Sequence, residues 1–370
     1  MPNDSSGRQA TVWIPGDLDP AHADRDFYGY YQIETHHYVV LSEAAQQSDC
    51  RCLSSDARIP PLKASHGEKG WSFTAGGQPC SLRPYGLDSD LFSRHAGLLE
   101  TAQMLSCGVI ICGCGSVGSL AALELARSGV GRFLLIDPDL LAIENLCRHQ
   151  CGLADVGRTK VQAVADRIHQ INPLAKVETY STTIERVDPA LIAAFTNGTS
   201  LMLACADSRR ADRHGARLAA GLGLAFLSIG LWERAFAGEI FYSHSGKEMP
   251  CYGCAFEGLA GELSQRPEPK RPFYTTEHEL RRLNFQPAIS IDIAYVTQIG
   301  LKLAIDLLNR DVSGYVPRLL GRLSQYTLVC NSNDPRVGGE ATEIFSHPLQ
   351  VTSSIQPTYG LGCPPCRWSQ

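Results

Sequence analysis

A glycine-rich loop between an apolar run and an amphipathic helix constrains the fold of this chain more than any other feature. Gly113, Gly115 and Gly118 form the pattern G-x-G-x-x-G directly after the apolar run CGVIIC. Glycines at these places permit a tight turn and a close approach of ligand to backbone, and the N-terminus of the following helix attracts phosphate. The sequence therefore predicts a strand, loop and helix that together bind a nucleotide.

An acidic residue follows this loop at the distance at which nucleotide-binding folds hold a ribose. Asp137 lies 19 positions after Gly118, at the end of the apolar run RFLLI, which we predict to be a strand. A carboxylate at this place accepts hydrogen bonds from ribose hydroxyls, whichever nucleotide carries them. The loop and the acid thus predict nucleotide binding but leave open whether the nucleotide is NAD.

Strand-like and helix-like segments alternate between about residues 91 and 231. Such alternation predicts a mostly parallel sheet with right-handed helical crossovers. Beyond residue 231, FAGEIFYS favours an antiparallel strand, a segment rich in proline and charge spans about 255–288, and SIDIAYVTQIGLKLAIDLL favours a long helix. We therefore predict an α/β fold with a doubly wound, mostly parallel, Rossmann-like sheet and an antiparallel extension.

Residues 1–88 differ in composition from the rest of the chain. They are rich in Pro, Gly, Asp and Ser, and strand-like pieces such as YYQIETHHYVVL and GWSFTA alternate with polar connections. We predict a small β-containing N-terminal module over residues 1–88, whose role the sequence does not indicate. It ends in a linker-like stretch, residues 76–88, and one large domain follows over 89–370.

Charge and hydropathy exclude some classes of partner. A formal net charge of −5 argues against nucleic acid, because proteins that bind its phosphate backbone carry basic surfaces. No apolar stretch approaches the roughly 18 residues that cross a bilayer, and no secretory signal pattern opens the sequence. We expect a soluble, cytoplasmic protein with neither nucleic acid nor membrane as partner.

The chain has 14 cysteines, and two pairs have C-x-x-C spacing, Cys251 with Cys254 and Cys363 with Cys366. Because disulfide frameworks are rare in reducing compartments, metal or redox chemistry is the better interpretation. Four thiolates in two pairs suit a tetrahedral structural zinc ion. A redox dithiol is the alternative for CPPC, although this pair does not open a helix after a strand.

Polar residues after the ribose acid favour phosphate chemistry over hydride transfer. The set comprises Asp139, Asn145, Arg148 and Lys160, and Asp207 follows the next buried strand. Hydride transfer needs no cations beside the ribose acid, whereas attack of an anion on a triphosphate needs its charge screened. Arg148 suits bidentate phosphate contact and Lys160 supplies a point charge. Asp207 would stand at the carboxyl edge of the sheet, where a magnesium ligand is needed.

These spacings together resemble a known superfamily. The order D-x-D-x5-N-x2-R, then V-G-x-x-K, then an Asp after an apolar strand is similar to that of ubiquitin-activating and ThiF-type adenylyltransferases. Their relatives include the molybdopterin-synthase, thiamine-pathway and microcin C adenylating enzymes. The segments SRHAG, RAFAGEIFY, CYGC and GCPPC resemble further parts of the same family, so that the resemblance covers about residues 91–370.

The resemblance implies roles for individual residues. Asp137 and Asn145 would hold the ATP ribose, Asp207 would bind Mg²⁺, and Asp139 would be either a turn or N-cap residue or a support for ribose or magnesium. Arg148, Lys160 and Arg94 of the partner subunit would bind the phosphates, which implies a homodimer. The four ligands of a split Zn²⁺ site would be Cys251, Cys254, Cys363 and Cys366.

Many relatives pass the acyl group to a cysteine of their own, in the segment that crosses the nucleotide site. Here residues 255–290 contain no cysteine. The remaining candidates for such a thiol are Cys50, Cys52, Cys147 and Cys151. Cys330 lies in an apolar strand and is expected in the core, and for Cys114, Cys147 and Cys151, which lie near the predicted site, packing is the alternative role. Adenylation itself requires no thiol, so we expect adenylation without an internal thioester.

The resemblance thus implies an enzyme that uses Mg-ATP to adenylate the C-terminal carboxylate of a ubiquitin-like protein. A conjugating enzyme or a sulfur donor would then accept the acyl group, in a bacterial ubiquitin-like conjugation or a sulfur-carrier pathway. The alternatives are a peptide-modifying adenylyltransferase of the microcin C type, a sulfur-carrier protein adenylyltransferase and a non-catalytic scaffold. An NAD-dependent oxidoreductase is disfavoured by the pair of Arg148 and Lys160.

Overall fold

The computed structural model describes residues 9–23, 25–42, 46, 50–196, 198–245, 247–264, 266 and 287–360. The chain divides into two compact units, Met1–Ala96 with Asn172–Leu174 and Gly97–Ile171 with Ala175–Gln370. Cys363 and Cys366 of the predicted zinc site lie outside the described residues. None of the helices that the structure describes is long and apolar enough to cross a membrane.

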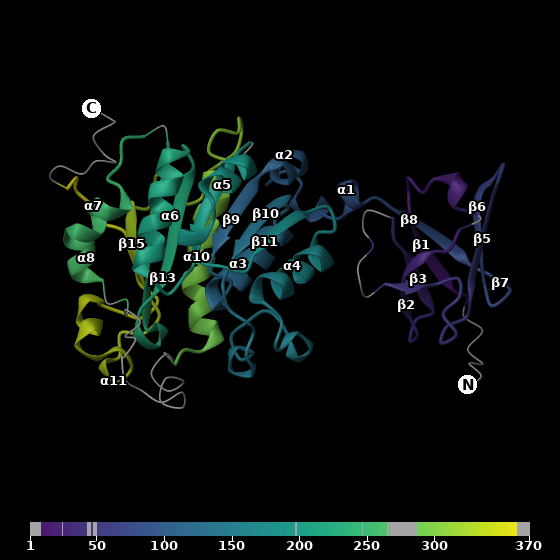
Figure 1. Cartoon of the computed structure of the whole chain (residues 1–370), viewed down its shortest axis with the longest axis horizontal. Coiled ribbons are helices and arrows are strands. Elements are labelled where there is room, and N and C mark those ends of the chain that lie inside the picture. The colour runs from purple at the N-terminus through teal and green to yellow at the C-terminus, as the bar shows by residue number, and fades with distance from the viewer. Residues whose placement is uncertain are drawn as a thin grey trace. The chain divides into compact units, whose positions relative to one another are not determined.

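The larger unit is built on one eight-stranded sheet with the strand order β11-β10-β9-β12-β13-β14-β15-β16 (Figure 1). The strands are β9 (Gly108–Cys112), β10 (Arg132–Ile136), β11 (Lys176–Tyr180), β12 (Ser200–Ala204), β13 (Ala225–Leu231), β14 (Ala237–Ser243), β15 (Tyr326–Cys330) and β16 (Val351–Thr352). Strands β9 to β13 pair in parallel, and β14, β15 and β16 pair antiparallel. The predicted fold class, a doubly wound α/β sheet with an antiparallel extension, is confirmed.

Helices cover both faces of this sheet because its strands are apolar on both faces. In β9, Val109 and Ile111 belong to one apolar cluster, and Ile110 and Cys112 to another. Alternate side chains of a strand point to opposite faces. Helices α3 (Ser116–Arg127), α4 (Lys160–Ile171) and α10 (Ser290–Leu308) supply residues to the first cluster, and α5 (Pro189–Phe195) and α6 (Arg209–Gly221) to the second.

Shorter helices complete the described residues. The α-helices are α1 (Leu87–Asp90), α2 (Thr101–Ser106), α7 (Tyr252–Glu257), α8 (Leu259–Leu263) and α11 (Pro335–Gly338). The 3₁₀ helices are η1 (Pro20–His22), η3 (Ser93–His95), η4 (Ile143–Asn145), η5 (Leu153–Asp155), η6 (Ile184–Arg186), η7 (Glu233–Ala235) and η8 (Gly339–Ile344).

The strand order reverses between β9 and β12. The chain moves outward from β9 through β10 to β11 and then returns to place β12 on the other side of β9. In open α/β sheets, ligands bind beyond the carboxyl ends of the strands at such a reversal. The glycine loop follows β9 and Asp207 follows β12, so the topology puts both at this point.

The N-terminal unit contains the predicted β-containing module. A five-stranded sheet has the order β4-β2-β3-β1-β8, and a three-stranded sheet the order β5-β6-β7. The strands are β1 (Thr11–Pro15), β2 (Tyr28–Gln32), β3 (His37–Val40), β4 (Arg51–Cys52), β5 (Leu62–Gly67), β6 (Gly70–Ala75), β7 (Gln78–Pro79) and β8 (Ser81–Tyr85). Its small core includes Val12, Tyr38 and Phe73.

The linker predicted at residues 76–88 is wrong, because this stretch forms β7 and β8. Strand β8 pairs in parallel with β1, and the guanidinium carbon of Arg83 lies 5.3 Å from the ring centroid of Trp13. Pro84 lies within β8, which is an edge strand, where a residue without an N–H is tolerated.

The three glycines of the loop serve different purposes. Gly113 has φ 95°, in the left-handed region, and a Cβ there would lie 2.9 Å from the amide nitrogen of Ala206. A Cβ on Gly118 would lie 1.8 Å from the carbonyl oxygen of Gly113, which no real contact allows. A Cβ on Gly115 would meet no atom within 4 Å. The packing therefore favours glycine at positions 113 and 118, whereas Gly115 faces open space.

We expect Gly118→Ala to lower the free energy of unfolding by about 1–3 kcal/mol or more, the usual cost of overpacking. The matched variant Gly115→Ala, at the N-cap of α3, should change it by less than about 1 kcal/mol. The free energy of unfolding of each variant is measured by urea denaturation, and hydrogen exchange of α3 reports whether this helix unfolds at the same urea concentration. Equal losses in the two variants would contradict the packing shown here.

Candidate functional site

Asp137 is fixed at the point where the glycine loop meets the end of β10. Its side chain is almost fully buried, with Oδ2 accepting the N–H of Cys114 at 2.7 Å and Oδ1 accepting the N–H of Asp139 at 2.8 Å. Burial raises the pKa of Asp137, although the charge of Lys160 opposes this. A carboxylate has about four acceptor positions, so two hydrogen bonds leave capacity for ribose hydroxyls.

A short antiparallel bridge brings Lys160 to the same place. After β10, the chain runs through residues 138–158 and returns so that Leu140 and Thr159 form a β-bridge. Helix α4 then begins at Lys160, whose Nζ lies 2.8 Å from Oδ2 of Asp139. The Lys160 side chain is only 11% exposed and that of Asp139 is 63% exposed. The ammonium is thus held at the inner side of this ion pair.

Three carboxylates act on this ammonium. Burial lowers the pKa of Lys160, but the negative charges of Asp137, Asp139 and Asp207 raise it further, and the net shift is upward from the ordinary value. Lys160 therefore stays protonated at neutral pH. The three acids come from the ends of two different strands, and all of them lie within electrostatic range of this one cation.

The loop that carries Asn145 and Arg148 is tied to the glycine loop by a residue that the sequence analysis missed. Buried His149 lies with Nε2 2.8 Å from the carbonyl oxygen of Cys114, and its Nδ1 accepts the N–H of Cys151 at 3.1 Å. Since a backbone N–H can only donate, the hydrogen of the ring is on Nε2. Burial lowers the pKa of His149, which keeps the ring neutral. The one sequence feature that could have pointed to His149 is its position directly after Arg148.

Asn145 is the last residue of the short helix η4, and Arg148 lies three residues further along the chain. The Asn145 side chain accepts the N–H of Ala142 at 2.9 Å, which closes the turn and leaves its amide N–H groups available. Both Asn145 and Arg148 are half-buried. The structure therefore places the two residues on the loop that His149 fastens beside the glycine loop.

Asp207 is exposed, and its carboxylate has no hydrogen bond or ion pair with any residue the structure describes. It follows β12 closely, and the N–H of Cys205 donates to the carbonyl oxygen of Cys112 at 2.8 Å, which joins the ends of β12 and β9. Mg²⁺ prefers oxygen ligands and is usually held by one or two carboxylates together with substrate phosphates. Asp207 fits such a role.

The first cysteine pair has the spacing of two ligands of one ion. The Sγ atoms of Cys251 and Cys254 lie 3.6 Å apart, and two thiolates on a tetrahedral zinc with bonds of about 2.3 Å would lie about 3.8 Å apart. A Cβ on Gly360 would lie 3.3 Å from Sγ of Cys254, so the chain three residues before Cys363 passes this pair. Within the described ranges, no group of three or more His, Cys, Asp or Glu side chains could hold a metal.

The other cysteines differ in their capacity to act as thiolates. Burial raises the pKa of Cys151 to about 12 and that of Cys330 to about 11, and it raises the pKa of Cys114 well above its ordinary value. The thiolate is the nucleophile, so these three are packing residues. Cys147 is exposed, next to Arg148, and Cys52 is half-buried in β4 of the N-terminal unit.

Arg94, the predicted phosphate-binding residue of a partner subunit, is an exposed residue of η3 in the N-terminal unit, and its predicted role stays a prediction.

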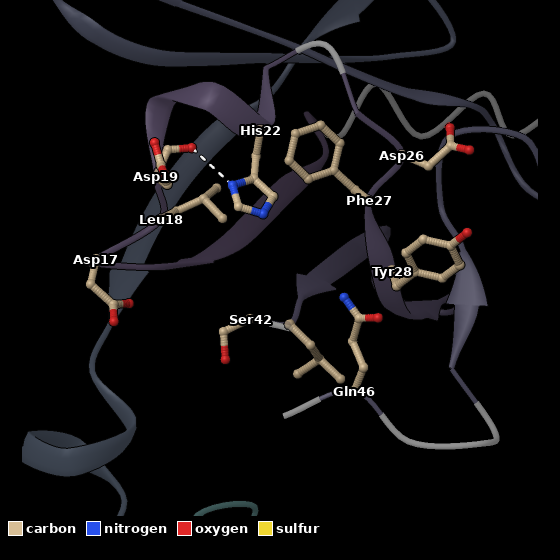
Figure 2. A pocket seen from close by; sticks show the side chains of 10 residues that line it. Asp17, Leu18, Asp19, His22, Asp26, Phe27, Tyr28, Ser42 and Gln46 are labelled. Carbon is tan, nitrogen blue, oxygen red and sulfur yellow. Dashed lines mark hydrogen bonds between the residues drawn. The ribbon is translucent and has the colours of Figure 1, made fainter. Parts of the chain in front are cut away.

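The N-terminal unit also contains a pocket of about 150 Å³, which is lined by Asp17, Asp19 and Asp26 together with apolar Leu18 and Phe27 (Figure 2). None of the residues predicted to bind nucleotide, metal or acyl group lines this pocket.

A doubly wound sheet with a glycine loop, a buried acid and a lysine at its switch point is typical of nucleotide-binding α/β proteins. Residues 88–334 match the ThiF family, which is more than half of the chain. The chain belongs to the ThiF family, and the resemblance predicted from the sequence is confirmed.

Curated relatives are named ubiquitin-like modifier-activating enzyme 5. The enzyme of Culex quinquefasciatus is 31% identical over 184 residues, which cover 46% of this chain and 46% of that enzyme. The enzyme of Oryza sativa subsp. japonica is 30% identical over 185 residues, which cover 46% of this chain and 44% of that enzyme. The chain therefore spans less than half the length of the curated relatives it matches.

Solved structures of MccB from E. coli share the fold. MccB with ATP superposes with a TM-score of 0.52 at 16% identity, over 76% of this chain and 75% of that one. MccB with MccA superposes with a TM-score of 0.52 at 16% identity, over 75% and 74%. At this level of identity the likeness establishes the fold alone.

Proposed function

We propose that this chain is an adenylyltransferase that uses Mg-ATP to activate the C-terminal carboxylate of a ubiquitin-like protein. The observation that carries the proposal is Lys160, which forms an ion pair with Asp139 and is also attracted by the buried Asp137 and by Asp207. Hydride transfer has no use for a cation there, whereas displacement at a phosphate needs one. The names of the curated relatives and the ATP complex of MccB support this choice.

The chemistry follows from the charges of the site. The carboxylate of the substrate is ionised at neutral pH, so no general base is needed. One of its oxygens attacks the α-phosphorus, a C–O–P linkage forms, and the bond from that phosphorus to the bridging oxygen breaks. Pyrophosphate leaves with the electron pair, and the other product is the acyl-adenylate.

In this proposal, different residues of the chain would bind the ribose, the phosphates and the magnesium ion. Asp137 and Asn145 hold the ribose, and the N-terminus of α3 faces the phosphates. Lys160 has three N–H donors, so it can keep its ion pair with Asp139 and still donate to a phosphate oxygen. Arg148 contributes a second cation. Mg²⁺, held by Asp207, would supply further positive charge to the phosphates.

A homodimer belongs to the proposal, with Arg94 of the partner subunit completing the phosphate contacts. Its support is the SRHAG segment alone. The alternative substrate is a peptide or a sulfur-carrier protein. Structures of MccB include one in complex with N-formylated MccA, with a TM-score of 0.50, which is the observation that favours a peptide as the alternative substrate.

A structural zinc site formed by Cys251, Cys254, Cys363 and Cys366 is also proposed. Its support is the Sγ–Sγ distance of 3.6 Å in the first pair and the passage of Gly360 beside Cys254. Such a site would join α7 to the C-terminal segment. Each zinc ion would thus link two parts of the chain that are distant in sequence.

Arg148→Ala and Lys160→Ala should each reduce pyrophosphate–ATP exchange by about 10²–10³-fold, the usual effect of losing one group that stabilises transition-state charge. Exchange is measured with candidate ubiquitin-like proteins, and Lys302→Ala, an exposed change on α10, is the matched control. ATP binding without any partner is measured by calorimetry. Tight binding of NAD together with no binding of ATP would contradict the proposed function.

Purified protein should contain about one zinc per chain, from the four-ligand rule. Cys254→Ser, or removal of the metal with a chelator, should lower the melting temperature because the link between α7 and the C-terminal segment is lost. Cys147→Ser is the control, since Cys147 is exposed and lies outside the proposed ligand set. A metal-free protein of unchanged stability would rule out the zinc site.

The acyl-adenylate should be the main product on the enzyme, with no thioester or only a minor one. Residues 255–290 have no cysteine, and burial makes Cys114 and Cys151 poor nucleophiles. The acceptor thiol would belong to a conjugating enzyme or a sulfur donor. The test incubates enzyme, Mg-ATP and cognate protein and compares non-reducing with reducing gels. A strong reductant-sensitive band that Cys147→Ser, Cys50→Ser or Cys52→Ser abolishes would show that the enzyme supplies the thiol.

A further inference from the structure

We propose that Arg266 is a positioning residue for the loop that carries Asp207, and that Asp212 holds it in place. This inference rests on the proposed function. The Arg266 side chain is 4% exposed and that of Asp212 is fully buried, with Nη1 of Arg266 2.5 Å from Oδ2 of Asp212. The other terminal nitrogen of Arg266 donates to the backbone carbonyl of Ala206. One guanidinium thus joins α6 to the residue directly before Asp207.

A glycine in β13 provides the space that the Arg266 side chain occupies. Gly230 lies in β13, and a Cβ there would be 3.0 Å from Cδ and 3.1 Å from Nη1 of Arg266. Glycine weakens a strand interior and often marks a place where another group approaches closely. The φ angle of Gly230 is not in the left-handed region, so the need here is for space. Three distant parts of the sequence, around residues 212, 230 and 266, therefore make one contact.

A second pair of opposite charges packs next to the first. Nη2 of Arg209 lies 3.2 Å from Oε1 of Glu239, and Ser264 bonds to both. Trp232 and Tyr326 also donate to Glu239, at 3.1 and 3.0 Å. Two arginines thus balance two carboxylates. A cluster with no net charge has no demand for a charged ligand, which favours a role in positioning over a role in binding.

Burying these charged groups costs desolvation free energy, and their hydrogen bonds do not fully offset it. Oδ1 of Asp212 and Nη1 of Arg209 are buried with no hydrogen-bond partner among the described residues. Hydrophobic side chains of similar volume often stabilise a fold as well as a buried ion pair does. Stability alone is therefore a weak reason for this arrangement.

Two contacts fall on the backbone of Ala206. Gly113 approaches so closely that a Cβ would lie 2.9 Å from the Ala206 nitrogen, and Arg266 donates to the Ala206 carbonyl. Asp207 is the next residue, so these contacts fix the backbone from which its carboxylate extends. Loss of the Arg266 contact would leave Asp207 in place only through its neighbours in the chain.

Arg266→Met removes the donors at similar volume, and Arg217→Met, an exposed change on α6, is the matched control. In protein without nucleotide, Arg266→Met should speed hydrogen exchange of the 205–209 segment. The Mg²⁺ concentration that half-saturates ATP binding should rise about tenfold, the effect of losing one hydrogen bond from a charged donor. Arg217→Met should change neither quantity. If Arg266→Met does not fold, Arg266→Lys, which keeps the charge but not the fork of donors, carries the same test.

A lower melting temperature with unchanged exchange of residues 205–209 and unchanged Mg²⁺ requirement would assign Arg266 to stability alone and overturn the inference. Absence of ATP binding in the unaltered protein would instead defeat the proposed function. In that case the exchange measurement, which needs no nucleotide, still decides whether Arg266 holds the loop.

Discussion

The carboxylate of Asp137 joins the parts of the nucleotide site that the sheet alone would leave separate. It accepts one N–H from the glycine loop after β9 and one from the loop after β10, at 2.7 and 2.8 Å. Hydrogen bonds to an ionised acceptor are shorter and stronger than those between neutral groups, and the acceptor here, Asp137, is buried. Because the loop after β10 leads to Lys160, the position of the cation depends on the same acid.

The sequence predicted those parts of the site that depend on local pattern. Strand and helix periodicity, the glycine spacing and the acid at the end of a strand are all encoded within a few residues, and the fold class followed from them. The family resemblance added the spacing that reaches Lys160 and Asp207. The β-bridge between Leu140 and Thr159, which brings Lys160 to Asp139, is the structural reason why that spacing works.

The misses are residues whose environment is set by distant parts of the chain. The prediction of a linker at residues 76–88 was wrong because the sequence does not reveal that β8 pairs with β1 at the edge of a sheet. The contact of Arg266 with Asp212 spans 54 positions, and its space is provided by Gly230 in another strand. His149 had a local signal, its place beside Arg148, but its burial and its bond to Cys114 depend on how two loops pack.

The electrostatics of the site bear on the form in which a nucleotide would bind. Asp137, Asp139 and Asp207 all act electrostatically on the ammonium of Lys160, so the described centre is acidic on balance even with Arg148 close by in sequence. A free triphosphate would meet repulsion there, since opposed like charges in a partly buried site are weakly screened. A magnesium ion beside Asp207 would remove that repulsion from both sides, because it neutralises the acid and the phosphates together. The excess of carboxylates therefore favours a nucleotide that arrives with its metal, because the two cations, Lys160 and Arg148, are fewer than the three acids of the centre.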